Sequence, residues 1–153
     1  MARSKQMSLQ FLLRGYLLVK AAEGCSQMLL VTPLYEGIYN SQLDLQYRIE
    51  AEGLQPLFVV QRDNWRDSSV MHALGTIANE EGIIEISANS RKVRFKIESE
   101  QEALEMLSRK SMWNLQLHLD LAFLIDITIA LLPQSSSTPT PTFIPAEQIK
   151  RIA

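Results

Sequence analysis

The stretch "SMWNLQLHLDLAFLIDITIALL", residues 111–132, is the most hydrophobic run of this 153-residue chain. A transmembrane helix needs roughly 20 apolar residues with few charges, and an Asp near the bilayer centre costs about 2.5–3.5 kcal/mol. Because Asp120 and Asp126 lie inside the run, a membrane span is not expected. Its odd positions are large and apolar, whereas most even positions are polar or small. The odd positions are Trp113, Leu115, Leu117, Leu119, Leu121, Phe123, Ile125, Ile127, Ile129 and Leu131.

This alternation is typical of a strand with one buried face. No Gly, Pro or Asn-Gly pair interrupts it, so we expect one unusually long, bent strand, or two collinear strands with a bulge near Ala122. Such a strand can serve two sheets or pair with another subunit. The alternative is a helix over 119–132.

The residue patterns of several other segments also predict strands. Residues 15–22 form the first, residues 43–50 alternate as a half-exposed strand, and residues 56–61 form a short buried strand with Pro56 at its start. Residues 27–39 fit a helix and a strand equally well, since Pro33 would kink or end a helix.

Two helices and a hairpin complete the domain. Asp67 is a suitable cap for a helix over 68–80, which Gly82 ends. Residues 83–99 read as a hairpin, and Ser99 with Glu102 forms a capping box for a helix over 100–110. The fold class predicted is therefore α+β: an antiparallel, strand-rich sheet domain with two or three helices.

The predicted organisation has four parts: an N-terminal segment over 1–14, a single α+β domain over 15–132, a disordered Pro/Ser/Thr linker over 133–142, and a short amphipathic segment over 143–153. We expect this last segment to dock on the domain or on a partner. The alternatives are the frayed start of a longer helix or an arbitrary chain end. Its apolar residues, the candidates for self-association, are Phe143, Ile144, Ile149 and Ile152.

Composition narrows the function classes. With 46% hydrophobic and 21% charged residues, the chain has an ordinary globular balance. The single Cys25 cannot form an internal disulfide, and the two His residues offer no zinc-ligand spacing, so no metal or cofactor is expected. We expect an intracellular protein, not secreted and without a transmembrane segment. The net charge of −2 argues against broad attraction to nucleic acid or to a membrane surface, and no specific nucleic-acid motif is present.

Catalytic motifs are missing from the sequence. It has no Gly-rich phosphate loop, no His-Glu-x-x-His and no nucleophile elbow, so we expect no catalytic residues and no enzyme. His72 is interpreted as structural, and His118, on the polar side of the long strand, as solvated or interfacial. A possible site for an anionic partner is the basic row Arg91, Lys92, Arg94 and Lys96 on one face of the hairpin. The alternative is an ordinary solvated sheet face.

A family resemblance rests on two pieces of the amino-terminal half. In "FLLRGYLLVKA" it involves Phe11, Gly15, Val19, Lys20 and Ala21; in "LYEGIYNS" it involves Tyr35, Glu36, Gly37, Ile38 and Tyr39. Together they resemble the start of the core domain of rhabdovirus matrix proteins, over about 30 residues. Unlike that family, this chain begins almost at the domain and is slightly acidic.

The resemblance implies a non-enzymatic assembly protein that self-associates, condenses the viral nucleocapsid and bridges it to a membrane. Its partners would be other copies of itself and the nucleocapsid or another protein. Two alternatives stay open: a cellular scaffold domain that recruits a protein partner, and a small ligand-binding domain.

Overall fold

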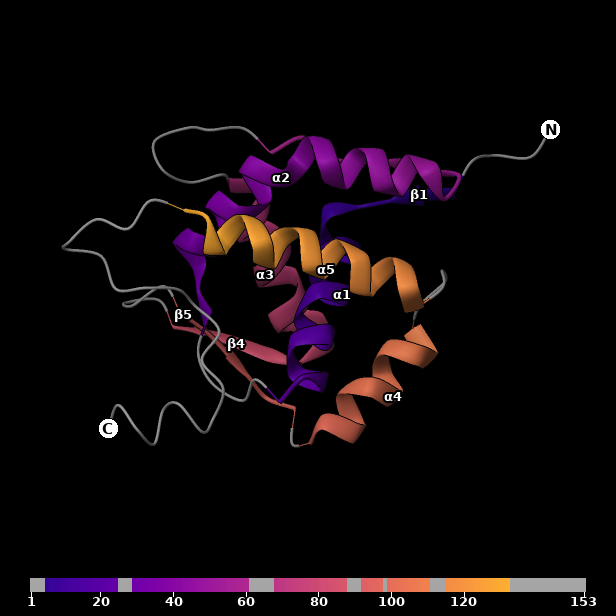
Figure 1. Cartoon of the computed structure of the whole chain (residues 1–153). Helices are drawn as coiled ribbons and strands as arrows, with labels where there is room; N and C mark the ends of the chain where they lie inside the picture. Colours follow the sequence, from indigo (N-terminus) through magenta and orange to yellow (C-terminus); the bar gives the residue numbers. More distant parts are fainter. Residues whose placement is uncertain are drawn as a thin grey trace.

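The computed structural model describes residues 5–24, 29–60, 68–87, 92–97, 99–110 and 115–132. Most of these residues are helical (Figure 1). In chain order the elements are β1 (Lys5–Met7), α1 (Leu9–Ala22), β2 (Leu29–Leu30), α2 (Val31–Ala51), β3 (Leu54–Pro56), α3 (Ser68–Thr76), the π-helical turn η1 (Ile77–Glu81), β4 (Ile84–Ser87), β5 (Lys92–Phe95), α4 (Glu100–Lys110) and α5 (Leu115–Ala130).

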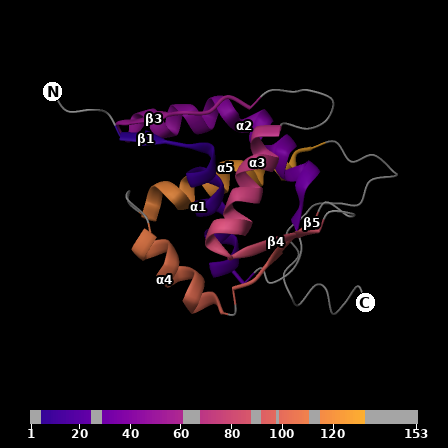
Figure 2. The same ribbon diagram turned by 180° about the vertical axis from the view of Figure 1, so that it is seen from behind.

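The predicted strand-rich antiparallel sheet is wrong. The described strands form two small sheets: β1 pairs with β3 in parallel, and β2, β5 and β4 form an antiparallel sheet in that order. Seen from behind, the β1–β3 pair runs along α2, away from β4 and β5 (Figure 2). The helices, not a sheet, therefore supply most of the core.

The long strand expected over residues 113–131 is the main correction, because residues 115–130 form helix α5. A row of every second residue contains two rows of every fourth residue, and residues four apart lie on one face of a helix. The row Leu117, Leu121, Ile125 and Ile129 is buried, and the other row is exposed. The helical alternative over 119–132 was correct in kind, although the helix begins earlier.

Strands predicted over 15–22 and 43–50 are also wrong, because both segments belong to helices. Ser8 caps α1, where its Oγ accepts a hydrogen bond from the Phe11 amide at 3.1 Å. Residues 15–21 of α1 are all buried, so this segment by itself shows no helical period, although Leu9, Leu12, Leu13, Tyr16 and Leu17 have the spacing of one helix face. Residues 27–39, left open between helix and strand, include β2 and the start of α2. Pro33 stands in the first turn of α2, where a missing amide donor costs little.

The strand expected over 56–61 is wrong in its bounds. Pro56 ends β3 rather than starting a strand, and residues 57–60 continue without regular structure. Gln42 holds this segment by two hydrogen bonds of 2.9 Å, one from its Nε2 to the Val60 carbonyl and one to its Oε1 from the Val60 amide.

The structure confirms the other elements that the sequence predicts. A helix follows position 68 as α3 and η1, and Gly82 ends it with a left-handed φ of 67°. The hairpin is present as β4 and β5, with Ile84 opposite Phe95. Ser99 Oγ accepts a hydrogen bond from the Glu102 amide at 3.0 Å at the start of α4. The Asp67 cap, the Asn89-Ser90 turn and the segments over 133–142 and 143–153 lie outside the described residues.

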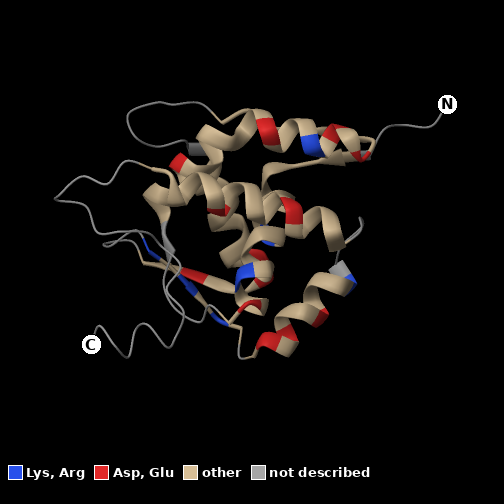
Figure 3. Cartoon of the chain, viewed as in Figure 1, with Lys and Arg blue, Asp and Glu red and all other residues tan. Residues whose placement is uncertain are grey.

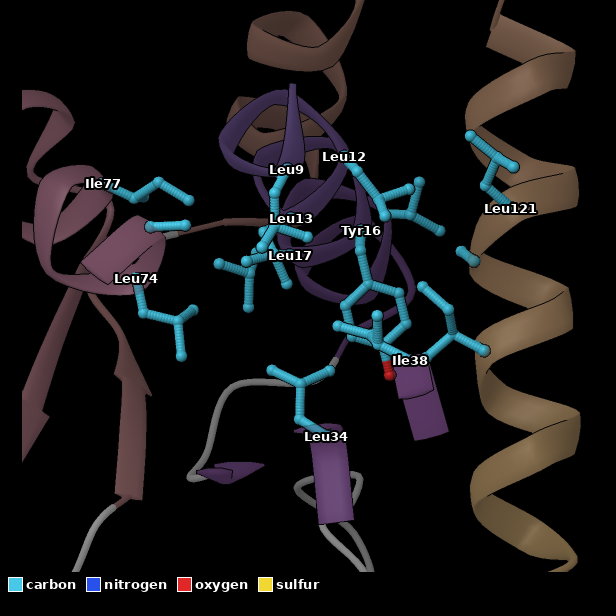
Figure 4. Close-up of a cluster of buried hydrophobic side chains, with 14 of the residues drawn as sticks. Leu9, Leu12, Leu13, Tyr16, Leu17, Leu34, Ile38, Leu74, Ile77 and Leu121 are labelled. Carbon is cyan, nitrogen blue, oxygen red and sulfur yellow. The ribbon is translucent and has the colours of Figure 1, made fainter. Parts of the chain in front are cut away.

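Helix α1 runs through the centre of the core. It packs against α4, α5 and α3. Its labelled side chains lie beside those of α2, of α3 with η1, and of α5 (Figure 4). The labelled members of this cluster are Leu9, Leu12, Leu13, Tyr16, Leu17, Leu34, Ile38, Leu74, Ile77 and Leu121. This packing leaves α5 as an outer helix whose inner face lies on α1 and α2.

Candidate interaction surface on helix α5

The outer face of α5 carries a row of large apolar side chains, each four residues from the next. We name this row the α5 stripe. Phe123, in its middle, is 63% exposed, and Leu131, just past the end of the helix, is 77% exposed. Contiguous exposed apolar surface on a soluble domain typically marks an interaction site. The α5 stripe consists of Leu115, Leu119, Phe123, Ile127 and Leu131.

Two close contacts fix which face of α5 points outward. A Cβ on Gly15 of α1 would lie 2.3 Å from His118 Nδ1, and a Cβ on Gly37 of α2 would lie 2.4 Å from Ile129 Cγ1. Only glycine permits so close an approach at either position. Since α5 is seated at both glycines, it cannot rotate to bury the stripe without losing both contacts.

His118 belongs to this buried side, contrary to the prediction that it is solvated or interfacial. It is 3% exposed and stacks on Phe11, with 6.4 Å between the ring centroids. Burial, and then the nearby positive charge of Arg14, lower the pKa of His118. The imidazole is therefore held neutral inside the fold, and it does not open onto the α5 stripe.

One acidic residue of α5 is paired with a cation of α1. Asp126 accepts hydrogen bonds from the Tyr16 hydroxyl at 2.7 Å and from Lys20 Nζ at 2.5 Å, and Lys20 Nζ also donates to Glu23 at 2.8 Å. Burial alone lowers the pKa of Lys20, but the hydrogen bonds and charges of Asp126 and Glu23 outweigh it and raise the pKa. Lys20 thus stays charged and is shared by Asp126 and Glu23.

The other acidic residue of α5 is paired with a cation of α2. Arg48 donates to Asp120 Oδ2 from Nε at 3.1 Å and from Nη2 at 3.0 Å, and Gln116 donates to Asp120 Oδ1 at 2.8 Å. Helix α5 has no Lys or Arg of its own (Figure 3). Each aspartate therefore has a cation from a neighbouring helix, but Arg48 also pairs with Glu52 at 3.0 Å and Lys20 with Glu23, so each of these groups keeps a net negative charge.

The predicted basic row is only partly described. Lys92 is half-buried and Lys96 is exposed, while the exposed Arg94 pairs with Glu85 of β4 at 3.2 Å. These three alternate along the hairpin with the buried Val93 and Phe95. Arg91 lies outside the described residues, as do the predicted self-association residues Phe143, Ile144, Ile149 and Ile152.

His72 is exposed on α3 and lines an open pocket of about 590 Å³ between the start of α1, residues 57–59 and α3. Gln10 and Ser69 are the other polar residues described in its lining. Within the described ranges, no group of three or more His, Cys, Asp or Glu is arranged to hold a metal ion. This pocket offers hydrogen bonds but no paired carboxylates for acid-base chemistry.

The spacing of the α5 stripe was visible in the sequence, but the strand interpretation did not recognise it as an exposed helix face. The period-four row was visible, but it was assigned to the buried face of a sheet together with the row that is in fact buried. Leu43 and Tyr47 were treated similarly, and they are 78% and 77% exposed on α2.

Comparison with known proteins identified no relative of this chain. No protein-family model, curated protein or solved structure matches the chain. Among the described helices, none combines the length and the apolar character that crossing a membrane requires.

Proposed function

We propose that this protein is a non-enzymatic interaction module that self-associates through the α5 stripe. The observation that carries the proposal is the exposed row of five large apolar side chains on a helix whose opposite face is tightly packed. Burying such a row against a partner removes apolar surface from water, at about 25 cal/mol for each Å².

A second copy of the same helix is the partner that fits best. Side chains four residues apart form a ridge, and ridges of this kind on two helices interdigitate at a crossing angle of about −50°. Two identical ridges can therefore pack about a two-fold axis, each filling the groove beside the other.

Charge does not prevent a second copy from binding. Two α5 helices without counterions would bring four aspartates together, and like charges at close range repel. Here Arg48 holds Asp120 and Lys20 holds Asp126 in each copy. The repulsion is therefore reduced before the two copies meet.

The contact is expected to be weak and reversible. A stable complex buries roughly 800 Å² on each partner, more than five side chains of one helix supply. Weak reversible contacts suit an assembly that forms only at high local concentration.

Matrix-type assembly at a membrane is a narrower proposal that rests on the family resemblance alone. Self-association through the α5 stripe is compatible with it, and Lys92, Arg94 and Lys96 are the described residues of the basic row that would contact an anionic surface. A scaffold that recruits a different protein through the stripe is the alternative, and a monomer that binds such a partner would favour it.

The test measures the average molar mass by light scattering over a hundredfold concentration range, at low and high salt. We expect the mass of the wild-type chain to rise with concentration at both salts, because apolar contacts survive screening. Phe123→Asp places a charge in the middle of the stripe and is expected to keep the protein monomeric.

Leu43→Asp is the matched control, since it adds the same charge at an exposed leucine of α2. It is expected to self-associate like the wild type. A constant monomer mass for the wild type at every concentration, or an equal loss in both variants, would overturn the proposal.

A further inference from the structure

We infer that residues 143–152 of the same chain, here called the tail segment, bind the α5 stripe and compete with the second copy. The inference rests on the proposed function, because the two occupants would share one surface. The tail segment then sets the concentration at which self-association begins.

The length of the chain allows this contact. The last described residues, Leu131 and Leu132, lie at the carboxyl end of α5, and Leu131 belongs to the stripe. Helix α5 has 16 residues and is about 24 Å long. The Pro-rich linker 133–142 can span up to about 31 Å at roughly 3.1 Å per residue. The tail segment can therefore reach any position along the stripe.

The chemistry of the two surfaces is complementary. The tail segment offers the apolar Phe143, Ile144, Ile149 and Ile152, which match an apolar row. Its charged residues are Lys150, Arg151 and Glu147, so it is basic by one charge. Helix α5 is acidic, with Asp120 and Asp126 as its charged groups. Their side chains are 37% and 31% exposed, so each has room for a second cation beside its present partner.

Tethering makes a weak contact effective. A tethered segment whose linker length matches the distance to its target meets that target at an effective concentration on the order of millimolar. A second copy reaches such a concentration only in a crowded assembly. Because the same side chains cannot be buried twice, the tail segment weakens self-association in dilute solution and yields to it at high protein concentration.

The first experiment compares dimer dissociation constants of full-length variants. Ile149→Asp with Ile152→Asp removes apolar contacts of the tail segment, and we expect dimerisation to become about tenfold tighter. Ser135→Asp with Ser136→Asp adds the same charge in the linker and should leave the constant unchanged. A constant equal to that of the wild type, or a weaker dimer, would overturn the inference; a weaker dimer would mean that the tail segment joins the contact between copies.

The second experiment locates the tail segment directly. A spin label at Gln148→Cys, in a chain carrying Cys25→Ser, should broaden the methyl signals of Leu119 and Ile127 in dilute monomer. Methyl signals of Leu74, on α3, should stay sharp. Broadening seen only when labelled and isotope-enriched chains are mixed would overturn a contact within one chain. The proposed function is tested separately, because Phe123→Asp abolishes self-association whether or not the tail segment binds.

Discussion

Gly15 and His118 show how single residues decide where α5 lies. The imidazole occupies the space of the missing Gly15 side chain and stacks on Phe11, whose other neighbour is the Arg14 guanidinium, 4.0 Å from the ring centroid. No sequence pattern around Gly15 or His118 predicts this contact, because it forms only where helices α1 and α5 pack together. Two predictions follow from the geometry at this point.

Gly15→Ala is expected to destabilise the protein by about 1–3 kcal/mol, since the new methyl would lie 2.3 Å from a buried ring that cannot move aside. Gly75→Ala, in α3, meets nothing within 4 Å and should instead stabilise by up to about 1 kcal/mol through helix propensity. Urea denaturation of both variants measures the difference. Equal stabilisation by both substitutions would contradict the close packing at Gly15.

Acidification is expected to weaken the fold through His118. Its pKa is lowered in the folded protein, while the unfolded chain keeps a pKa of about 6.5, so the unfolded state binds a proton more readily. The stabilisation by the neutral imidazole is complete above pH ~6.5 and is lost as pH falls below it, at about 1.4 kcal/mol for each pKa unit.

The check is the free energy of unfolding between pH ~7 and ~5, where most carboxylates stay ionised. His118→Gln should lose this slope, even if it is less stable throughout. His72→Gln, at an exposed position of α3, is the matched control and should keep the slope. A wild-type protein with no slope in this window would refute the prediction.

At the scale of elements, the sequence of residues 111–132 is compatible with both a strand and a helix, and only the neighbouring elements distinguish the two. Alternation by two is compatible with a strand and, as two interleaved rows, with a helix that is apolar on opposite sides. The helix satisfies its own backbone hydrogen bonds, whereas a strand of that length needs long partners on a sheet. The small sheets of this fold offer none among the described residues.

The contact between α1 and α5 also depends on one ion pair, and Asp126→Ala tests it. The variant removes the Asp126 acceptor from the Tyr16 hydroxyl and leaves Lys20 Nζ, on a side chain only 10% exposed, with Glu23 as its remaining carboxylate. We expect a loss of about 1–3 kcal/mol, because buried donors that lose a partner keep their desolvation cost. Thermal unfolding measures it.

The double variant Lys20→Met with Asp126→Leu replaces both charges by apolar groups and is the companion measurement. It should recover most of the stability, because no charge is left buried alone. Loss of similar size in the double variant would show that the ion pair, rather than the isolated charge, determines the stability.

At the scale of the whole molecule, the exposed and buried rows of α5 link stability to association. The buried row anchors the helix on α1 and α2, so the outer row is presented at a constant place. An interaction surface on a rigidly packed helix loses little entropy on binding. This property suits a module that assembles through repeated weak contacts.

The sequence by itself determined the local features: the helices after positions 68 and 99, the Ser99 cap, the left-handed Gly82 and the β4–β5 hairpin. Each depends on residues within a few positions of one another. Only the tertiary structure decided that 15–22, 43–50 and 115–130 are helical, that His118 is buried, and which row of α5 faces solvent. The reason is that a helix buried on most sides, or apolar on two sides, has no single polar face, so its period becomes visible only when its neighbours cover one row and leave the other open.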